Sequence, residues 1–218
     1  MAKKKNISAD NIRDSFMDYL LNHGEHPKSV YAFSKILGID ESLFYEHYAS
    51  FEIIERIVFQ SFYDNTVALL EENKEYHSFD PQNKLLSFYF TFFEILKANR
   101  SYVLMVLKQN KNQLKALQSL AELRTSFLKF IEQLELDSMD LKVPQLEDIK
   151  EKAILEGSWA QFLFTLKFWL DDSSANFEKT DLLIEKSIST SFALMDNQTF
   201  NSVFDLGKFL FKEAMGKK

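Results

Sequence analysis

The sequence contains no cysteine, which excludes a disulfide framework and a metal site built on thiolates. A chain without cysteine is also suited to a reducing compartment. Glycine and proline are scarce, at 5 and 3 of 218 residues, too few for the many turns of a β-sandwich or a β-barrel. The composition therefore predicts an all-α protein.

A long hydrophobic run is also missing. The most apolar segment, LLSFYFTFFEILKANRSYVLMVL, is interrupted by Glu94, Lys97, Asn99 and Arg100, so neither half approaches the ~20 apolar residues of a membrane-spanning helix. The N-terminus has a basic tip without the apolar core of a secretory signal. These absences predict a soluble, cytoplasmic protein. Its net charge of −6 argues against indiscriminate binding to nucleic acid.

Signals of catalysis are missing as well. The chain has no glycine-rich phosphate loop and no cysteine nucleophile, and its four histidines are scattered. His23 and His26 lack a third ligand at metal-site spacing. The pair Asp171–Asp172 is interpreted as a solvent-exposed helix end. The sequence therefore predicts no enzyme, no catalytic residue, no metal and no cofactor.

Short helical patterns separated by turn signals fill the first part of the chain. We expect helices over residues 9–23, 29–37, 41–47 and 51–75. Gly24 and Gly38 lie where helices end, and Ser29 and Asp40 are suitable N-caps. Two short helices joined by a tight turn, with a third helix before them, form a helix-turn-helix pattern.

The order of residues around that turn is specific. Gly38, Ile39 and Asp40 form the turn, the aromatic stretch YEHY follows it, and Glu52 begins the next helix. In this order SVYAFSKILGIDESLFYEHYASFEII resembles the N-terminal domain of TetR-family transcriptional regulators. The resemblance implies a TetR-like fold with a helix-turn-helix head at 1–50, a connector helix at about 51–75, a homodimer and a C-terminal ligand pocket.

The resemblance also implies that the head binds duplex DNA. The candidate contacts are Lys28, Ser29, Ser42, Leu43, Tyr45 and His47. For Tyr45 and His47, packing in the core of the head is an equally supported alternative, and for Tyr48 it is the favoured one.

The charges of this segment depart from the family pattern. No lysine or arginine lies between Ile39 and Glu55, and the same stretch carries five acidic residues. Glu46 stands where a basic residue commonly follows the tyrosine, and Phe51 stands where a lysine is expected. Repulsion between these acids and phosphates acts over a Debye length of ~8 Å. The basic arm Lys3–Lys5 and the helix N-termini remain for phosphate contacts, so weak or narrowly specific DNA binding is predicted.

A second, larger region is expected at 76–218 as an antiparallel helical bundle for ligand binding and dimerisation. Its predicted helices are 81–97, 101–110, 112–136, 146–170, 180–196 and an extra C-terminal helix at about 199–215. The helix at 154–170 is apolar on two faces, so it should be buried on several sides. One face is a candidate subunit interface, because TetR-like proteins pair through their last helices, and the other is a candidate cavity wall.

Aromatic residues suggest what this region binds. The chain has 22 phenylalanines, and their excess favours a small apolar ligand or a lipid. The candidate ligand contacts are Phe88, Tyr89, Phe92, Trp159, Phe162 and Leu166. Core packing is the competing explanation for each of them taken singly.

The C-terminal segment repeats apolar residues at three-and-four spacing beside lysines. It either docks on the body, which is favoured, or makes peripheral contact with a membrane. The phrase DLGKFLFK resembles a Bacteroidetes-type branch of TetR-fold proteins. An alternative function follows: a TetR-fold lipid-binding or adaptor protein, similar to the lipid-binding protein of ubiquinone biosynthesis, whose head is vestigial.

Overall fold

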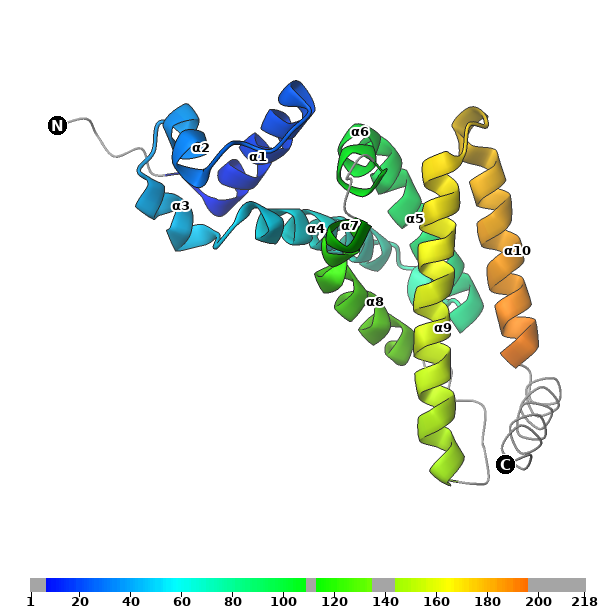
Figure 1. Ribbon diagram of the computed structural model, residues 1–218. Coiled ribbons are helices and arrows are strands. Elements are labelled where there is room, and N and C mark those ends of the chain that lie inside the picture. Colours follow the sequence, from blue (N-terminus) through cyan, green and yellow to red (C-terminus); the bar gives the residue numbers. More distant parts are fainter. Residues whose placement is uncertain (1–6, 109–112, 135–143, 196–218) are drawn as a thin grey trace, which may run out of the picture. The chain divides into compact units, whose positions relative to one another are not determined.

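The computed structural model describes residues 7–108, 113–134 and 144–195, and all regular secondary structure in those ranges is helical (Figure 1). This confirms the predicted all-α class. The chain divides into two compact units, one made of residues 1–72 with 91–127 and the other of 73–90 with 128–218. None of the described helices is long and apolar enough to cross a membrane.

The first unit begins with three helices gathered around the start of a fourth (Figure 1). They are α1 (Ala9–His23), α2 (Val30–Leu37), α3 (Glu41–His47) and α4 (Phe51–Glu72). The local signals act as expected: Ser8 and Ser29 accept hydrogen bonds from backbone N–H groups of the first turns of α1 and α2. Gly24 and Gly38 adopt left-handed conformations, with φ of 71° and 69°, which end the two helices.

Aromatic rings form the core of this head. Phe16, Phe33 and Phe44 are buried, and Phe51 at the start of α4 lies among them, with ring centroids 5.2–5.7 Å from theirs. Tyr48 is also buried, and its hydroxyl donates a hydrogen bond of 2.9 Å to the carbonyl oxygen of Ala9. The packing of Tyr48 in the head core is therefore confirmed.

The rest of the first unit contains two interruptions that the periodicity did not predict. The expected helix 101–110 is α6 (Arg100–Val103) followed by a π-helix, η2 (Leu104–Lys108). The expected helix 112–136 is broken into α7 (Gln113–Gln118) and α8 (Ala121–Gln133). The break falls at Ser119, which is buried and whose hydroxyl donates to a carboxylate of α4. A tertiary hydrogen bond accompanies the change of helix direction here, and helical periodicity does not report it.

The second unit is dominated by two long helices that run side by side, α9 (Pro144–Asp171) and α10 (Glu178–Met195) (Figure 1). Helix α5 (Pro81–Ala98) supplies residues to both units, and short 3-10 turns lie at Tyr76–Ser78 (η1) and Ala175–Phe177 (η3).

Asp172, between α9 and α10, is buried, so its interpretation as solvent-exposed was wrong. Its carboxylate accepts four hydrogen bonds, from the backbone N–H and hydroxyl of Ser174 and from those of Thr180 in the first turn of α10. Burial raises the pKa of Asp172, but these hydrogen bonds outweigh it and hold the pKa at about 2. The residue therefore acts as a buried anionic cap of α10.

Two sequence-based expectations lie outside the described residues. They are the basic arm Lys3–Lys5 and the C-terminal helix at about 199–215. The predicted division into domains 1–50 and 76–218 with a connector between them stays a prediction.

Candidate functional site

Of the six candidate DNA contacts, Lys28 and Ser29 lie just before α2 and the other four lie on α3. Lys28, Ser42, Tyr45 and His47 are exposed, and Tyr45 has 52% of its surface in solvent. Leu43 is half-buried. Ser29 is exposed, but its side-chain oxygen accepts the capping bond from Ala32. The structure therefore turns Tyr45 and His47 outward, while Phe44 before them and Tyr48 after them close the core.

Glu46 and Phe51, the two positions of the head where a basic residue was expected, lie in different environments. Glu46 is exposed on α3, so its charge faces solvent or a ligand. Phe51 instead stacks on Phe16, with ring centroids 5.2 Å apart and an interplanar angle of 9°. A phenylalanine at this position therefore contributes to the head core, and a lysine there would lose those contacts.

Five of the six candidate ligand contacts are buried. Phe88 stacks on Phe130 at 4.8 Å, and Tyr89 meets Phe162 edge-on at 5.9 Å. Leu166 and Phe92 are also buried, whereas Trp159 is half-buried and stacks on Phe162 at 5.2 Å. Phe88, Tyr89, Trp159 and Phe162 thus make packed aromatic contacts within the second unit, whereas Phe92 belongs to the first unit. A ligand-binding role for the six residues stays a prediction.

The second unit also has a groove of about 690 Å³ between α9 and α10. None of the six candidate ligand contacts lines it: Trp159, Phe162 and Leu166 are also on α9 but are not among the lining residues, and α10 carries none of the six. Small residues line the α9 side, and Phe164, with 59% of its surface exposed, lies at one wall. The lining residues are Ala153, Ile154, Gly157, Ser158, Ala160, Gln161, Phe164, Leu183, Lys186, Ser187, Thr190, Ser191 and Leu194.

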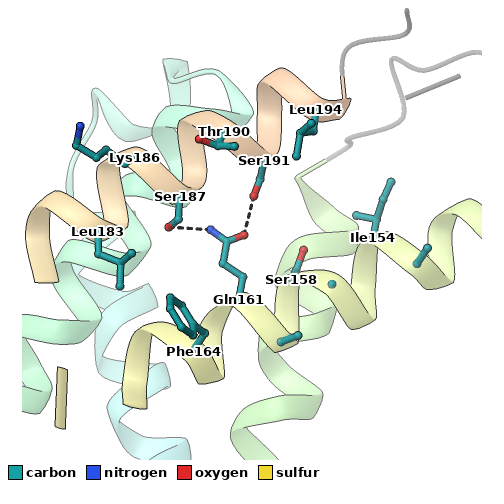
Figure 2. A pocket seen from close by; sticks show the side chains of 13 residues that line it. Ile154, Ser158, Gln161, Phe164, Leu183, Lys186, Ser187, Thr190, Ser191 and Leu194 are labelled. Atoms are coloured by element: carbon teal, nitrogen blue, oxygen red, sulfur yellow. Dashed lines mark hydrogen bonds between the residues drawn. The ribbon is translucent and has the colours of Figure 1, made fainter. Parts of the chain in front are cut away.

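Gln161 joins the two helices at this groove (Figure 2). Its amide nitrogen donates to Ser187 at 3.2 Å, and its amide oxygen accepts from the hydroxyl of Ser191 at 2.9 Å. Both functional ends of the amide are thus used to fix α9 against α10. The surface left around it is mostly apolar and slightly concave, which suits contact with another apolar surface.

A polar pocket of about 340 Å³ lies in the first unit and was not predicted. It contains His26, Glu52, Glu55 and Lys115, and Glu55 is buried on α4. Lys115 and Glu52 form an ion pair of 3.6 Å between exposed side chains. In the helical pattern Glu55 reads as an ordinary surface residue of α4, and the sequence carries no signal that its partners come from two distant turns. In the described ranges no group of three or more His, Asp or Glu is placed to hold a metal ion.

Comparisons with known proteins bear on the larger part of the chain. The family model for the Tetracyclin repressor-like, C-terminal domain matches residues 84–210. That range is more than half of the 218 residues. No curated protein and no solved structure matches the chain.

Proposed function

Because the chain belongs to the TetR family of transcriptional regulators, we propose that it is a homodimer that binds duplex DNA weakly through its head and an apolar molecule through its C-terminal region. The exposure of Tyr45 and His47 on α3, beside a core closed by Phe44 and Tyr48, is the observation that supports DNA binding most directly. A helix with outward side chains after a tight turn is what a major groove accepts.

Weak affinity follows from the charges of α3. The segment Glu41–His47 carries two glutamates and no lysine or arginine. Most of the free energy of protein–DNA association that is independent of base sequence comes from cations that displace counterions from phosphates. A recognition helix without them depends on base contacts, hydroxyls and the few cations beside it, among them Lys28.

The test is a salt titration of duplex binding, measured by fluorescence anisotropy, for wild type and Glu46→Arg. Glu46 is exposed, so the substitution should not disturb the fold. We expect Glu46→Arg to bind more tightly and to steepen the slope of log K against log salt by roughly 1. Glu71→Arg, on the last turn of α4 and also exposed, is the matched control for net charge. Equal gains from the two substitutions would mean that α3 is not presented to DNA.

Dimerisation is proposed through α9 and α10. The two helices carry exposed Phe164, Phe168, Leu182 and Leu194, apolar side chains that a monomer would leave in water, and Phe164 and Leu194 line the groove. The small residues along the groove would let a helix of a second copy approach closely. We expect Phe164→Arg to dissociate the dimer in analytical ultracentrifugation at concentrations where wild type and the exposed control Lys167→Ala stay paired.

The ligand is proposed to be apolar and to contact Phe88, Tyr89, Phe92, Trp159, Phe162 and Leu166. Aromatic rings that already pack together would have to separate to admit it, so binding should be slow and should change the environment of Trp159. Stopped-flow tryptophan fluorescence with a fatty acid as probe, compared between wild type and Trp159→Phe, would follow this change.

A second function is a TetR-fold lipid-binding or adaptor protein with a vestigial head. The exposed Glu46 and the absence of a cation on α3 favour it. Native mass spectrometry of the protein purified from its host separates the two proposals. A co-purifying lipid together with no DNA binding by Glu46→Arg supports the second, and a ligand-free dimer whose Glu46→Arg variant gains DNA affinity supports the first.

A further inference from the structure

Glu55 is a buried carboxylate near the start of α4, with 4% of its surface exposed. Burial of a charge is costly unless hydrogen bonds and an opposite charge compensate for it. Here Nε2 of His26 lies 2.9 Å from Oε1, and the hydroxyl of Ser119 donates to Oε2 at 3.0 Å. Both carboxylate oxygens are therefore engaged.

The two partners of Glu55 come from distant turns of the first unit. His26 lies between α1 and α2, inside the head, and Ser119 lies between α7 and α8. Helix α4 carries Glu55 between them. A displacement of either turn from α4 would break a hydrogen bond on which the buried carboxylate depends, so the cluster couples the position of the α1–α2 turn to that of the α7–α8 turn.

The protonation state of His26 sets the strength of this coupling. The hydrogen bond to Glu55 raises the pKa of His26 above its ordinary value of 6.5, although partial burial lowers it. The charge of Glu52 on α4 adds to the rise, and Lys115 on α7 opposes it. Glu25 lies beside His26 in the same pocket, and α1 and η2 contribute apolar side chains, Leu20, Met105 and Val106.

Tyr102 on α6 is the remaining titratable group near the carboxylate. Its hydroxyl is buried without a hydrogen-bond partner. Burial, with the charge of Glu55 in addition, raises the pKa of Tyr102 well above its ordinary value. It therefore stays neutral while His26 titrates, and the charge of the cluster changes at His26.

We propose that His26, Glu55 and Ser119 form a proton-controlled tie, which holds the α1–α2 turn against α4 while His26 is charged and loosens when His26 is neutral. A neutral imidazole still offers one hydrogen bond but no longer balances the buried charge. Because the pKa of His26 is raised on folding, the tie is fully present below pH 6.5 and is lost as the pH rises through the folded-state pKa. The tie does not depend on what the head binds.

The test is amide hydrogen exchange of the turn around His26, measured at about pH 5.5 and about pH 8.5 and corrected for intrinsic exchange. In wild type the local opening equilibrium should rise by roughly tenfold at the higher pH, the factor expected when the imidazole keeps a hydrogen bond to the carboxylate but no longer carries the opposite charge. His26→Gln should show the open level at both pH values. His23→Gln, at the end of α1 with its ring hydrogen-bonded to the carbonyl oxygen of Tyr19, should keep the wild-type pH dependence. A wild-type turn whose opening does not change with pH would overturn the proposal.

A second measurement distinguishes loss of the tie from unfolding of a variant. An NMR titration of the His26 ring in wild type and in Ser119→Ala, which keeps the His26–Glu55 pair, should give a raised pKa in both. Glu55→Gln should return the pKa of His26 toward its ordinary value. An unchanged His26 pKa in Glu55→Gln would show that the carboxylate does not hold the proton, and the tie would be rejected.

Discussion

The head and the α9–α10 pair use aromatic residues in opposite ways. In the head, Phe16, Phe33 and Phe44 pack inward around Phe51, whereas Tyr31 and Tyr45 are exposed, as are the aliphatic Leu21 and Ile36. In the α9–α10 pair, Phe162 and Trp169 are buried, but Phe164 at the groove and Phe168 one turn further along α9 remain exposed. The head thus uses its phenylalanines in its own core, whereas α9 leaves two of its phenylalanines exposed.

This difference separates the roles that the two regions can have. A small domain whose core is closed by its own phenylalanines can present a short helix to a partner while that core stays intact. A helix pair with an apolar groove and exposed phenylalanines is suited to bury that surface against another chain or an apolar molecule. Substitutions within the core of the head should therefore cost more stability than substitutions at the contacts between α9 and α10.

The largest effect is expected for Phe44→Ala. Phe44 is fully buried and its ring contacts those of Phe33, Tyr48 and Phe51, so truncation leaves a cavity that should lower the free energy of unfolding by roughly 3–5 kcal/mol. Urea denaturation followed by circular dichroism measures this loss. Tyr45→Ala, one residue later but exposed, should cost less than about 0.5 kcal/mol. Similar losses for the two variants would contradict the assignment of inward and outward faces.

Phe51→Lys should also destabilise the head, by roughly 2–4 kcal/mol, because the stacked contact with Phe16 is lost. The substitution introduces the cation that the TetR-family pattern has at this position. A gain in DNA affinity from this variant is therefore expected only if the head stays folded, which the same denaturation curve reports. A variant as stable as wild type would show that Phe51 is dispensable to the core.

Asp172→Ala should weaken the second unit by roughly 2 kcal/mol at neutral pH, since four hydrogen bonds at the start of α10 are lost. The pKa of Asp172 is lowered from 3.8 to about 2, so its contribution is present above pH 3.8 and is lost as the pH falls through about 2. The difference in unfolding free energy between wild type and variant should therefore shrink on acidification. The adjacent exposed Asp171→Ala serves as the control.

The smallest effect is expected for Gln161→Ala, which removes two hydrogen bonds between α9 and α10 at the edge of the groove. Each such bond contributes about 1 kcal/mol or less when solvent can replace it. We expect a loss of roughly 1 kcal/mol in thermal unfolding, with the dimer intact. Loss of the dimer in this variant would indicate that the groove needs the fixed spacing of its two helices.

Much of the head could be predicted from its sequence because its signals are local. Ser29 caps α2 and Gly38 ends it through bonds within a few residues, and these depend only on the identity of those residues. The inward position of Tyr48 is the favoured expectation from the sequence, whereas the exposure of Tyr45 is left open by the sequence and is decided by the packing of α3. The family match covers residues 84–210 and does not include the head. It agrees with the TetR resemblance of the head sequence.

The missed features are all long-range. Asp172 looks like one of two acids at a helix end, and its burial depends on the first turn of α10 folding back over it. Phe51 looks like an unusual replacement in a DNA-contact position, and its purpose is visible only beside Phe16. The break at Ser119 accompanies a hydrogen bond to a carboxylate 64 residues earlier in the chain.

The sequence by itself determined the helical class, the position of the helix-turn-helix turn and the scarcity of cations on α3, because propensity, capping and charge are properties of neighbouring residues. The tertiary structure decided which aromatic rings are core and which face solvent, where the groove between α9 and α10 lies, and that Glu55 is a buried anion between two distant turns. Those outcomes depend on which helix surfaces pack against each other after the helices have formed. The desolvation of side chains at these contacts cannot be recognised in a single sequence, whereas helical periodicity can.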